Sequence, residues 1–201
     1  MKNKKKQLSK KKPAVKTIES SSKQSFFSSI KAKITHFFSH PLNAIIFKFS
    51  ALMAVFYMIW ATQFFQENVI QPVTSLYAKA TGFVLQLAQF PVMIMNDSIG
   101  DMNFAISIKT GCDGIEGMAI LLFAILVYPT TWSNRIKGLA IGFACLVFLN
   151  FIRIISLYFI GVHIPSLFDI MHVNIWQIIF IIVPLVIIYQ WVVWINKQKI
   201  A

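Results

Sequence analysis

Four segments of the chain are long and apolar enough to cross a lipid bilayer. They cover residues 43–65, 114–131, 138–161 and 174–195. A transmembrane helix needs about 20 predominantly apolar residues, and 57% of the 201 residues here are hydrophobic, which is rare in a soluble domain. Because a backbone in lipid must satisfy its own hydrogen bonds, we expect these spans to be helical. The sequence predicts an all-α fold: a polytopic membrane helix bundle of about four to five transmembrane helices plus interfacial amphipathic helices.

The first 40 residues are different in character, because they carry 11 of the 19 Lys and Arg residues. Residues 1–24 are rich in Lys, Ser and Gln, which predicts disorder. Residues 25–40 place apolar side chains at helical spacing, which predicts an amphipathic helix on the membrane surface. We therefore expect a basic cytoplasmic tail over 1–40, near anionic lipid, and a membrane-embedded domain over 41–201. No nucleic-acid-binding motif accompanies the net charge of +12, so no nucleic-acid partner is expected.

Positive charge also sets the expected orientation in the membrane. Arg135 and Lys137 lie in a segment between two spans, predicted as a loop over 132–137, and Lys197 and Lys199 lie in the C-terminal tail. Cytoplasmic segments carry an excess of Lys and Arg. The N-terminus, this loop and the C-terminus are therefore expected in the cytoplasm, with 66–113 and 162–173 outside.

Residues 72–95 are apolar enough to span, but one crossing there would place the Arg135 loop outside. The segment also contains Lys79, Gln86 and Gln89. We expect a helix at the outer interface or a re-entrant hairpin ending near Pro91, with a fifth span as the alternative. Residues 102–109 alternate apolar and polar side chains, which predicts a short extracytoplasmic strand.

Three polar residues converge on one membrane depth under this topology. Cys112 immediately precedes the inward-going span 114–131, and His172 immediately precedes the last span. Arg153 is eight residues from the outer end of span 138–161, or about 12 Å at 1.5 Å per residue. Ionisable residues at membrane depth are costly and mark functional sites. We expect one site on the outer face.

The residue types at this site fit acyl transfer. The thiolate of Cys112 is a nucleophile, and a cation or a helix N-terminus lowers the pKa of such a thiol. His172 can accept and return a proton, whereas Arg153 can stabilise a thiolate or an oxyanion. Gly111 and Gly114 permit a close backbone approach beside the thiol. An ionised Asp113 would disfavour the thiolate.

Other interpretations of these residues remain open. Arg153 could snorkel or pair with Glu116, and His172 could be an ordinary interfacial histidine. Asp169 and His172 are three residues apart but lack a third ligand, so neither a metal nor another cofactor is expected. Small residues on the span 138–161 could admit a substrate helix, although packing within the bundle is the simpler reading.

Three segments resemble the signature regions of the exosortase/archaeosortase family. Members of this family are membrane-embedded cysteine enzymes of the cell envelope. They are TGCDGIEGMAILLFAILVYP (110–129), LNFIRIISLYFIG (149–161) and LFDIMHVNIWQ (167–177), and the pattern is most similar to the exosortase H subgroup. The resemblance implies catalytic roles for Cys112, Arg153 and His172. Glu116, Asn150, Gly111 and Gly114 belong to the matching motifs and are expected to support the site.

The resemblance also implies a substrate class and a location. Substrates would be exported proteins with a C-terminal recognition motif, a transmembrane helix and a basic end. A cysteine protease or transpeptidase in the bacterial inner membrane would cleave them at the outer face and pass them to the cell surface. Two other functions remain open: a non-catalytic membrane scaffold in envelope polysaccharide assembly, and a thiol-dependent acyltransferase acting on lipid or glycan.

Overall fold

The computed structural model describes residues 41–102, 104–109 and 111–200. The predicted tail over 1–24 and the amphipathic helix over 25–40 lie outside the described residues. The chain divides into two compact units, Met1–Ile46 and Phe47–Ala201. Of the first unit only the opening residues of one helix are described, so the fold below is that of the second.

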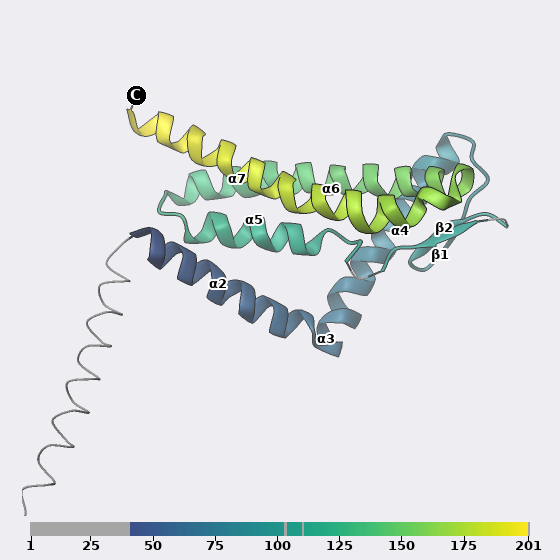
Figure 1. Ribbon diagram of the computed structural model, residues 1–201, viewed down its shortest axis with the longest axis horizontal. Coiled ribbons are helices and arrows are strands. Elements are labelled where there is room, and N and C mark those ends of the chain that lie inside the picture. Colours follow the sequence, from purple (N-terminus) through teal and green to yellow (C-terminus); the bar gives the residue numbers. More distant parts are fainter. Residues whose placement is uncertain (1–40, 103, 110, 201) are drawn as a thin grey trace, which may run out of the picture. The chain divides into compact units, whose positions relative to one another are not determined.

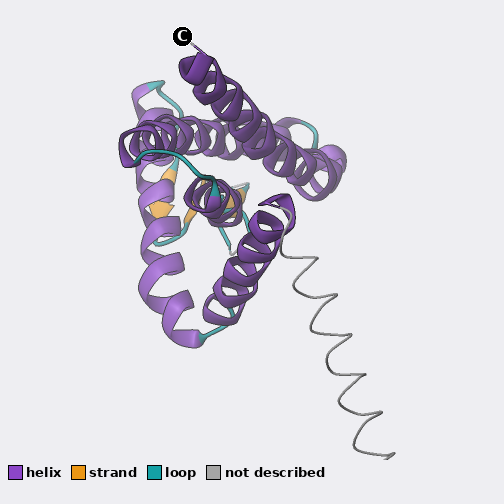
Figure 2. Ribbon diagram, turned by 90° about the vertical axis from the view of Figure 1, so that its left-hand side faces the viewer, coloured by secondary structure: helices purple, strands orange, loops and turns teal. Residues whose placement is uncertain are grey.

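The described elements are mainly helical, with one small sheet (Figures 1 and 2). In chain order they are α2 (Pro41–Trp60), α3 (Gln63–Phe65), the π-helix η1 (Gln66–Ile70), α4 (Gln71–Leu87), β1 (Met93–Met95), β2 (Ser98–Gly100), β3 (Ala105–Ser107), α5 (Ile115–Val127), α6 (Trp132–His163), the 3₁₀-helix η2 (Pro165–Leu167), the π-helix η3 (Ile170–Ile175) and α7 (Trp176–Ile200).

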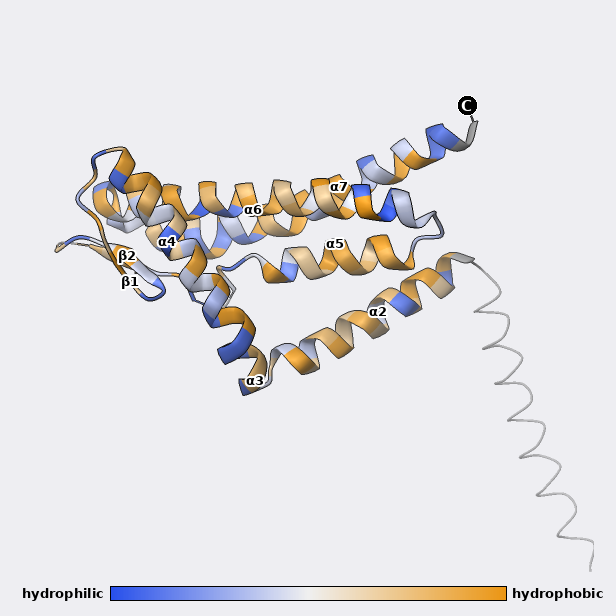
Figure 3. Cartoon of the chain, turned by 180° about the vertical axis from the view of Figure 1, so that it is seen from behind, coloured by the Kyte–Doolittle hydropathy of each residue, from blue (hydrophilic) through white to orange (hydrophobic). Residues whose placement is uncertain are grey.

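A helix lies within each predicted span, and the all-α membrane bundle is confirmed. The helix in the span 43–65 ends at Trp60, before a short turn and α3. Within the described residues, three helical stretches are long and apolar enough to cross a membrane: Leu42–Trp60, Trp132–His163 and Pro165–Gln198. Figure 3 shows the apolar colouring along these helices. The helix α5 is apolar but shorter than its predicted span of 114–131, because Gly114 has a positive φ at its start and Pro129 follows its end.

The expected loop over 132–137 is wrong, because these residues are already helical. The side chain of Thr131 caps α6 by accepting a hydrogen bond from the backbone N–H of Asn134. Thr at an N-cap satisfies one of the free N–H groups of the first turn. The connection from α5 is therefore confined to 128–131, and α6 continues unbroken for 32 residues, about 48 Å at 1.5 Å per residue.

Residues 72–95 form a helix followed by a strand rather than one apolar unit. The helix α4 ends at Leu87 and is not among the helices long and apolar enough to span. Gln89 and Asn96 then adopt positive φ values of 65° and 52°, which turn the chain into β1 and from β1 into β2. The predicted strand over 102–109 is present as β3, whereas β1 and β2 were not predicted. The three strands form an antiparallel sheet in the order β1-β2-β3.

Close helix packing holds α5 against α6 and α7. The Leu121 side chain of α5 occupies the space beside Gly142 of α6, and the indole of Trp191 occupies the space beside Gly138. A Cβ at either glycine would overlap this neighbouring side chain. The small residues at these two positions therefore pack the bundle. This packing fixes the beginnings of α5 and α7 beside the last third of α6, the region that carries Arg153.

Candidate active site

Cys112 lies in the short connection between β3 and α5. Its backbone N–H donates to the Lys109 carbonyl, with an N···O distance of 2.8 Å. Gly111 and Gly114 on either side have φ values of 89° and 75°, a region that favours glycine. A Cβ on Gly114 would also lie 3.0 Å from the Phe180 ring. The glycine pattern therefore serves a tight turn that presents the thiol just before a helix.

Asp113 holds this turn together from inside the protein. Its side chain is fully buried and accepts hydrogen bonds from the backbone N–H groups of Ile115, at 2.8 Å, and Gly111, at 3.3 Å. The side-chain amide of Asn150 on α6 donates to the Asp113 carbonyl at 3.3 Å. The sequence presented Asp113 only as a charge unfavourable to the thiolate. Its spacing of two residues from Ile115 was the available signal, because Asp side chains commonly accept from N–H groups two residues on.

The structure brings Cys112, Arg153 and His172 together. The Cys112 Sγ atom lies 2.6 Å from Nε2 of His172. One terminal guanidinium nitrogen of Arg153 donates to the same sulfur at 3.5 Å, and the other donates to the Gly111 carbonyl at 3.4 Å. An imidazole and a guanidinium therefore contact one sulfur atom, each from a different helical element.

The two partner residues are held by distinct local structures. Arg153 is 2% exposed, and its guanidinium carbon lies 5.1 Å from the centre of the Phe180 ring, a cation–π distance. Its Nε has no hydrogen-bond partner among the described residues. His172 is on the π-helix η3, with its ring 5.5 Å from that of Phe168. Short π-helical segments are frequent at functional sites because they redirect side chains.

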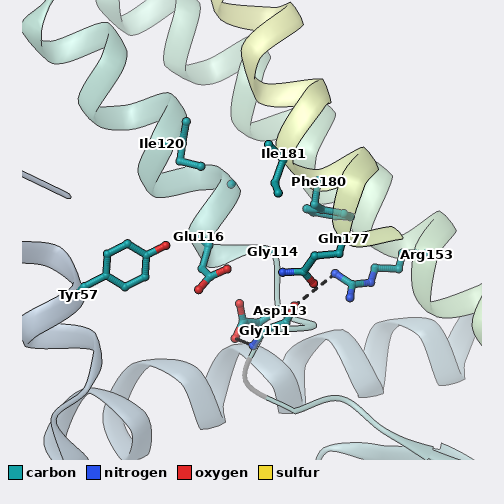
Figure 4. Close-up of a pocket in the computed structure, with 11 residues that line it drawn as sticks. Tyr57, Gly111, Asp113, Gly114, Glu116, Ile120, Arg153, Gln177, Phe180 and Ile181 are labelled. Carbon is teal, nitrogen blue, oxygen red and sulfur yellow. Dashed lines mark hydrogen bonds between the residues drawn. The ribbon is translucent and has the colours of Figure 1, made fainter. Parts of the chain in front are cut away.

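A cavity of about 360 Å³ lies beside Arg153 (Figure 4). Its polar side chains come from four helices and the turn before α5: Tyr57, Asp113, Glu116, Arg153 and Gln177. The Tyr57 hydroxyl points toward Glu116 in Figure 4. Within the described residues the structure shows no ion pair between Glu116 and Arg153, whose hydrogen bonds go to Cys112 and Gly111. The alternative that Arg153 is the counter-ion of Glu116 therefore lacks structural support.

A family model described as transmembrane exosortase matches residues 27–196. The chain belongs to the transmembrane exosortase family. No curated protein and no solved structure gave a match. Membership of the exosortase family supports a membrane transpeptidase-like role, and the match spans all the residues of the site, including the expected supporting residues Glu116 and Asn150.

Burial dominates the electrostatics of the thiol in this exosortase. It raises the pKa of Cys112, while the positive charge of Arg153 acts in the opposite direction and Asp113 adds a smaller upward effect. Burial likewise raises the pKa of Asp113, against the lowering effect of its backbone hydrogen bonds and Arg153. The expected lowering by a cation is present, but burial outweighs it. These effects together favour the neutral thiol over the thiolate.

The pH dependence of Cys112 alkylation measures this balance. In a Cys145→Ser background, the alkylation rate with iodoacetamide should rise with a midpoint above that of an ordinary thiol. Arg153→Met removes a charge that favours the thiolate, so the midpoint should move up. Asp113→Asn removes a charge that disfavours it and keeps an oxygen for the Ile115 N–H, so the midpoint should move down. A shift of either variant in the other direction would contradict this electrostatic account.

Among the described residues, no three His, Cys, Asp or Glu side chains are grouped so that they could hold a metal ion.

Proposed function

We propose that this exosortase is a cysteine protease or transpeptidase of exported proteins. It would cleave C-terminal sorting signals at the outer face of the bacterial inner membrane and transfer the proteins toward the cell surface. The observation that carries the proposal is the contact of one sulfur, Cys112 Sγ, with both His172 and Arg153. A nucleophile within hydrogen-bond reach of a base is the arrangement that covalent acyl transfer requires.

The reaction begins with the neutral thiol. His172 Nε2 removes the proton as Sγ attacks the scissile carbonyl carbon, and negative charge moves to the carbonyl oxygen. Arg153, which donates to Sγ, would stabilise the thiolate and then that oxyanion. The imidazolium returns its proton to the leaving amine as the C–N bond breaks, which leaves an acyl thioester on Cys112. Water, or an amine or hydroxyl acceptor, gives a proton to His172 as it attacks the thioester carbonyl carbon. The C–S bond then breaks, and the imidazolium returns the proton to Sγ, which restores the neutral thiol.

The proposed orientation places this chemistry at the membrane surface. If the N-terminus, the 128–131 connection and the C-terminus are cytoplasmic, the Cys112 turn and η3 lie at the extracytoplasmic ends of their helices. A substrate anchored by a C-terminal helix would present the motif preceding that helix at the same depth. We also propose that 41–201 form the membrane-embedded domain and that the basic tail over 1–40 faces anionic lipid on the cytoplasmic side.

Capture with hydroxylamine tests the proposed function. Membranes containing this chain and an exported protein with a motif, a terminal helix and a basic end are treated with hydroxylamine, which attacks thioesters. The expected product is the exported protein shortened at its C-terminus and ending in a hydroxamate, identified by mass spectrometry. A fatty hydroxamate would instead support the lipid acyltransferase alternative. If neither product forms while the chain and exported protein are both present in the membrane, the scaffold alternative gains support and the proposal fails.

A further inference from the structure

The strand that leads to Cys112 is at the edge of its sheet. In the order β1-β2-β3, one side of β3 pairs with β2 and the other side pairs with no strand of the described chain. An edge strand presents a row of backbone N–H and C=O groups and is a template for an added strand. Here the edge strand runs into the turn that carries the thiol.

The ladder pattern shows which backbone groups face the open edge. Hydrogen bonds run from Asp101 N–H to the Phe104 carbonyl at 2.9 Å and from Ile108 N–H to the Asp97 carbonyl at 2.8 Å. Hydrogen-bonded pairs alternate along an antiparallel ladder, which makes the central Ile99–Ile106 pair hydrogen-bonded as well.

The residues between the bonded pairs therefore turn their backbones outward. They are Ala105 and Ser107, whose N–H and C=O groups point away from β2. Both residues are exposed, and the described residues offer no backbone partner to either of them. Their side chains lie on the outer face of the sheet, whereas Ile106 and Ile108 are buried in the core.

The strand β3 and the thiol line one pocket. Ile106, Ser107 and Ile108 line it together with Cys112, with Arg153, Ile154 and Leu157 of α6, and with Phe168 and His172. Its volume of about 20 Å³ is enough for roughly one water molecule, so a peptide beside the thiol must displace some of these side chains.

We propose that β3 is the docking strand for the extended peptide of the substrate that flanks the scissile bond. This rests on the proposed function. Outward N–H and C=O groups repeating every two residues match another extended backbone, and a lipid acyl chain has no groups to pair with them. The other edge strand, β1, is a weaker candidate. The hollow that β1 lines also includes residues of β2 and Ala105 of β3, and it contains none of Cys112, Arg153 or His172.

A matched pair of variants at Ser107 tests this docking. Both Ser107→Pro and Ser107→Ala lose the hydroxyl that donates to Asp97 at 3.0 Å. Only proline also removes the outward N–H, which takes no part in pairing with β2. Proline is tolerated on edge strands at such positions. We expect Ser107→Pro to raise the KM for a processed exported protein about tenfold, the effect of roughly one hydrogen bond, while Ser107→Ala stays within about twofold.

Two readouts separate docking from misfolding and from the failure of the proposed function. The rate of Cys112 alkylation by iodoacetamide should be equal in the two Ser107 variants, since the turn itself is unchanged. Wild-type enzyme is then given synthetic substrate segments N-methylated at successive backbone positions around the cleavage site. The loss of cleavage caused by N-methylation should alternate along the segment with a period of two residues, because only every second N–H faces β3.

Uniform tolerance of N-methylation, or equal KM values for the Pro and Ala variants, would overturn the docking proposal while leaving cleavage by Cys112 intact. Loss of Cys112 alkylation in the Pro variant alone would show that the turn was damaged, and the N-methylated segments then decide the matter with the wild-type enzyme. If the wild-type enzyme does not cleave the unmodified segment, the proposed function fails first.

Discussion

Arg153→Met is expected to lower the rate of substrate cleavage by about 10²–10³, the usual cost of removing one donor that stabilises an oxyanion. The methionine side chain is of similar length and apolar, so it can occupy the buried site beside Phe180 without leaving an unpaired charge. What it loses is the pair of hydrogen bonds to the Cys112 sulfur and the Gly111 carbonyl. The measurement is kcat for cleavage of an exported protein by purified enzyme in lipid.

Arg153→Lys separates charge from geometry at this position. A guanidinium contacts two acceptors at once, whereas an ammonium is a compact point charge. We expect the lysine variant to recover only part of the lost rate. The matched control is Arg135→Met, which removes the charge of another arginine of the same helix, one that donates to the Tyr128 carbonyl and lies over the Trp132 ring. Equal losses for Arg135→Met and Arg153→Met would mean that the effect is structural.

Two measurements, the cleavage rate and the pH midpoint of Cys112 alkylation, distinguish the two possible roles of Arg153. If its contribution is to the thiolate, the loss of rate should match the change in the pH midpoint of Cys112 alkylation. If it stabilises the oxyanion, the rate should fall much further than the alkylation midpoint explains. Full activity of Arg153→Met would contradict both roles.

The helices and the meeting of the three polar residues were accessible from the sequence. Long apolar runs are local signals, and the positions of Cys112, Arg153 and His172 relative to those runs predict a shared membrane depth. Their mutual distances were not accessible, because these depend on which faces of α5, α6 and α7 pack together. The unbroken start of α6 was missed because Arg135 and Lys137 suggested a loop, although Thr131 is a good N-cap residue.

Other features were missed. Of the sheet only β3 was predicted, from the alternation over 102–109, because β1 and β2 have three residues each and give no clear alternation. The cavity beside Arg153 combines Tyr57 with Gln177, which are far apart in the chain. The dominance of burial over the charge of Arg153 in setting the Cys112 pKa follows from the packing around the turn. The extent of that packing cannot be predicted from composition alone.

Cys112→Ala is expected to abolish cleavage, a loss on the order of 10⁶ if it resembles removal of a serine-protease nucleophile. No other described nucleophile replaces the thiol, because Cys145 lies in α6 in another pocket, beside Trp191 and Trp194. Alanine fits the half-buried site and leaves the hydrogen bonds of Asp113 in place, so the fold should be retained. Cys145→Ala is the matched control and should cleave at the wild-type rate.

The most direct measurement is the intact mass of an exported protein recovered from membranes that contain either the wild-type chain or Cys112→Ala. We expect a protein shortened at its C-terminus before its terminal helix with the wild-type chain and with Cys145→Ala, and the full-length protein with Cys112→Ala. A shortened protein of the same mass with Cys112→Ala, at equal levels of the two chains in the membrane, would contradict the assignment of this site as the catalytic centre.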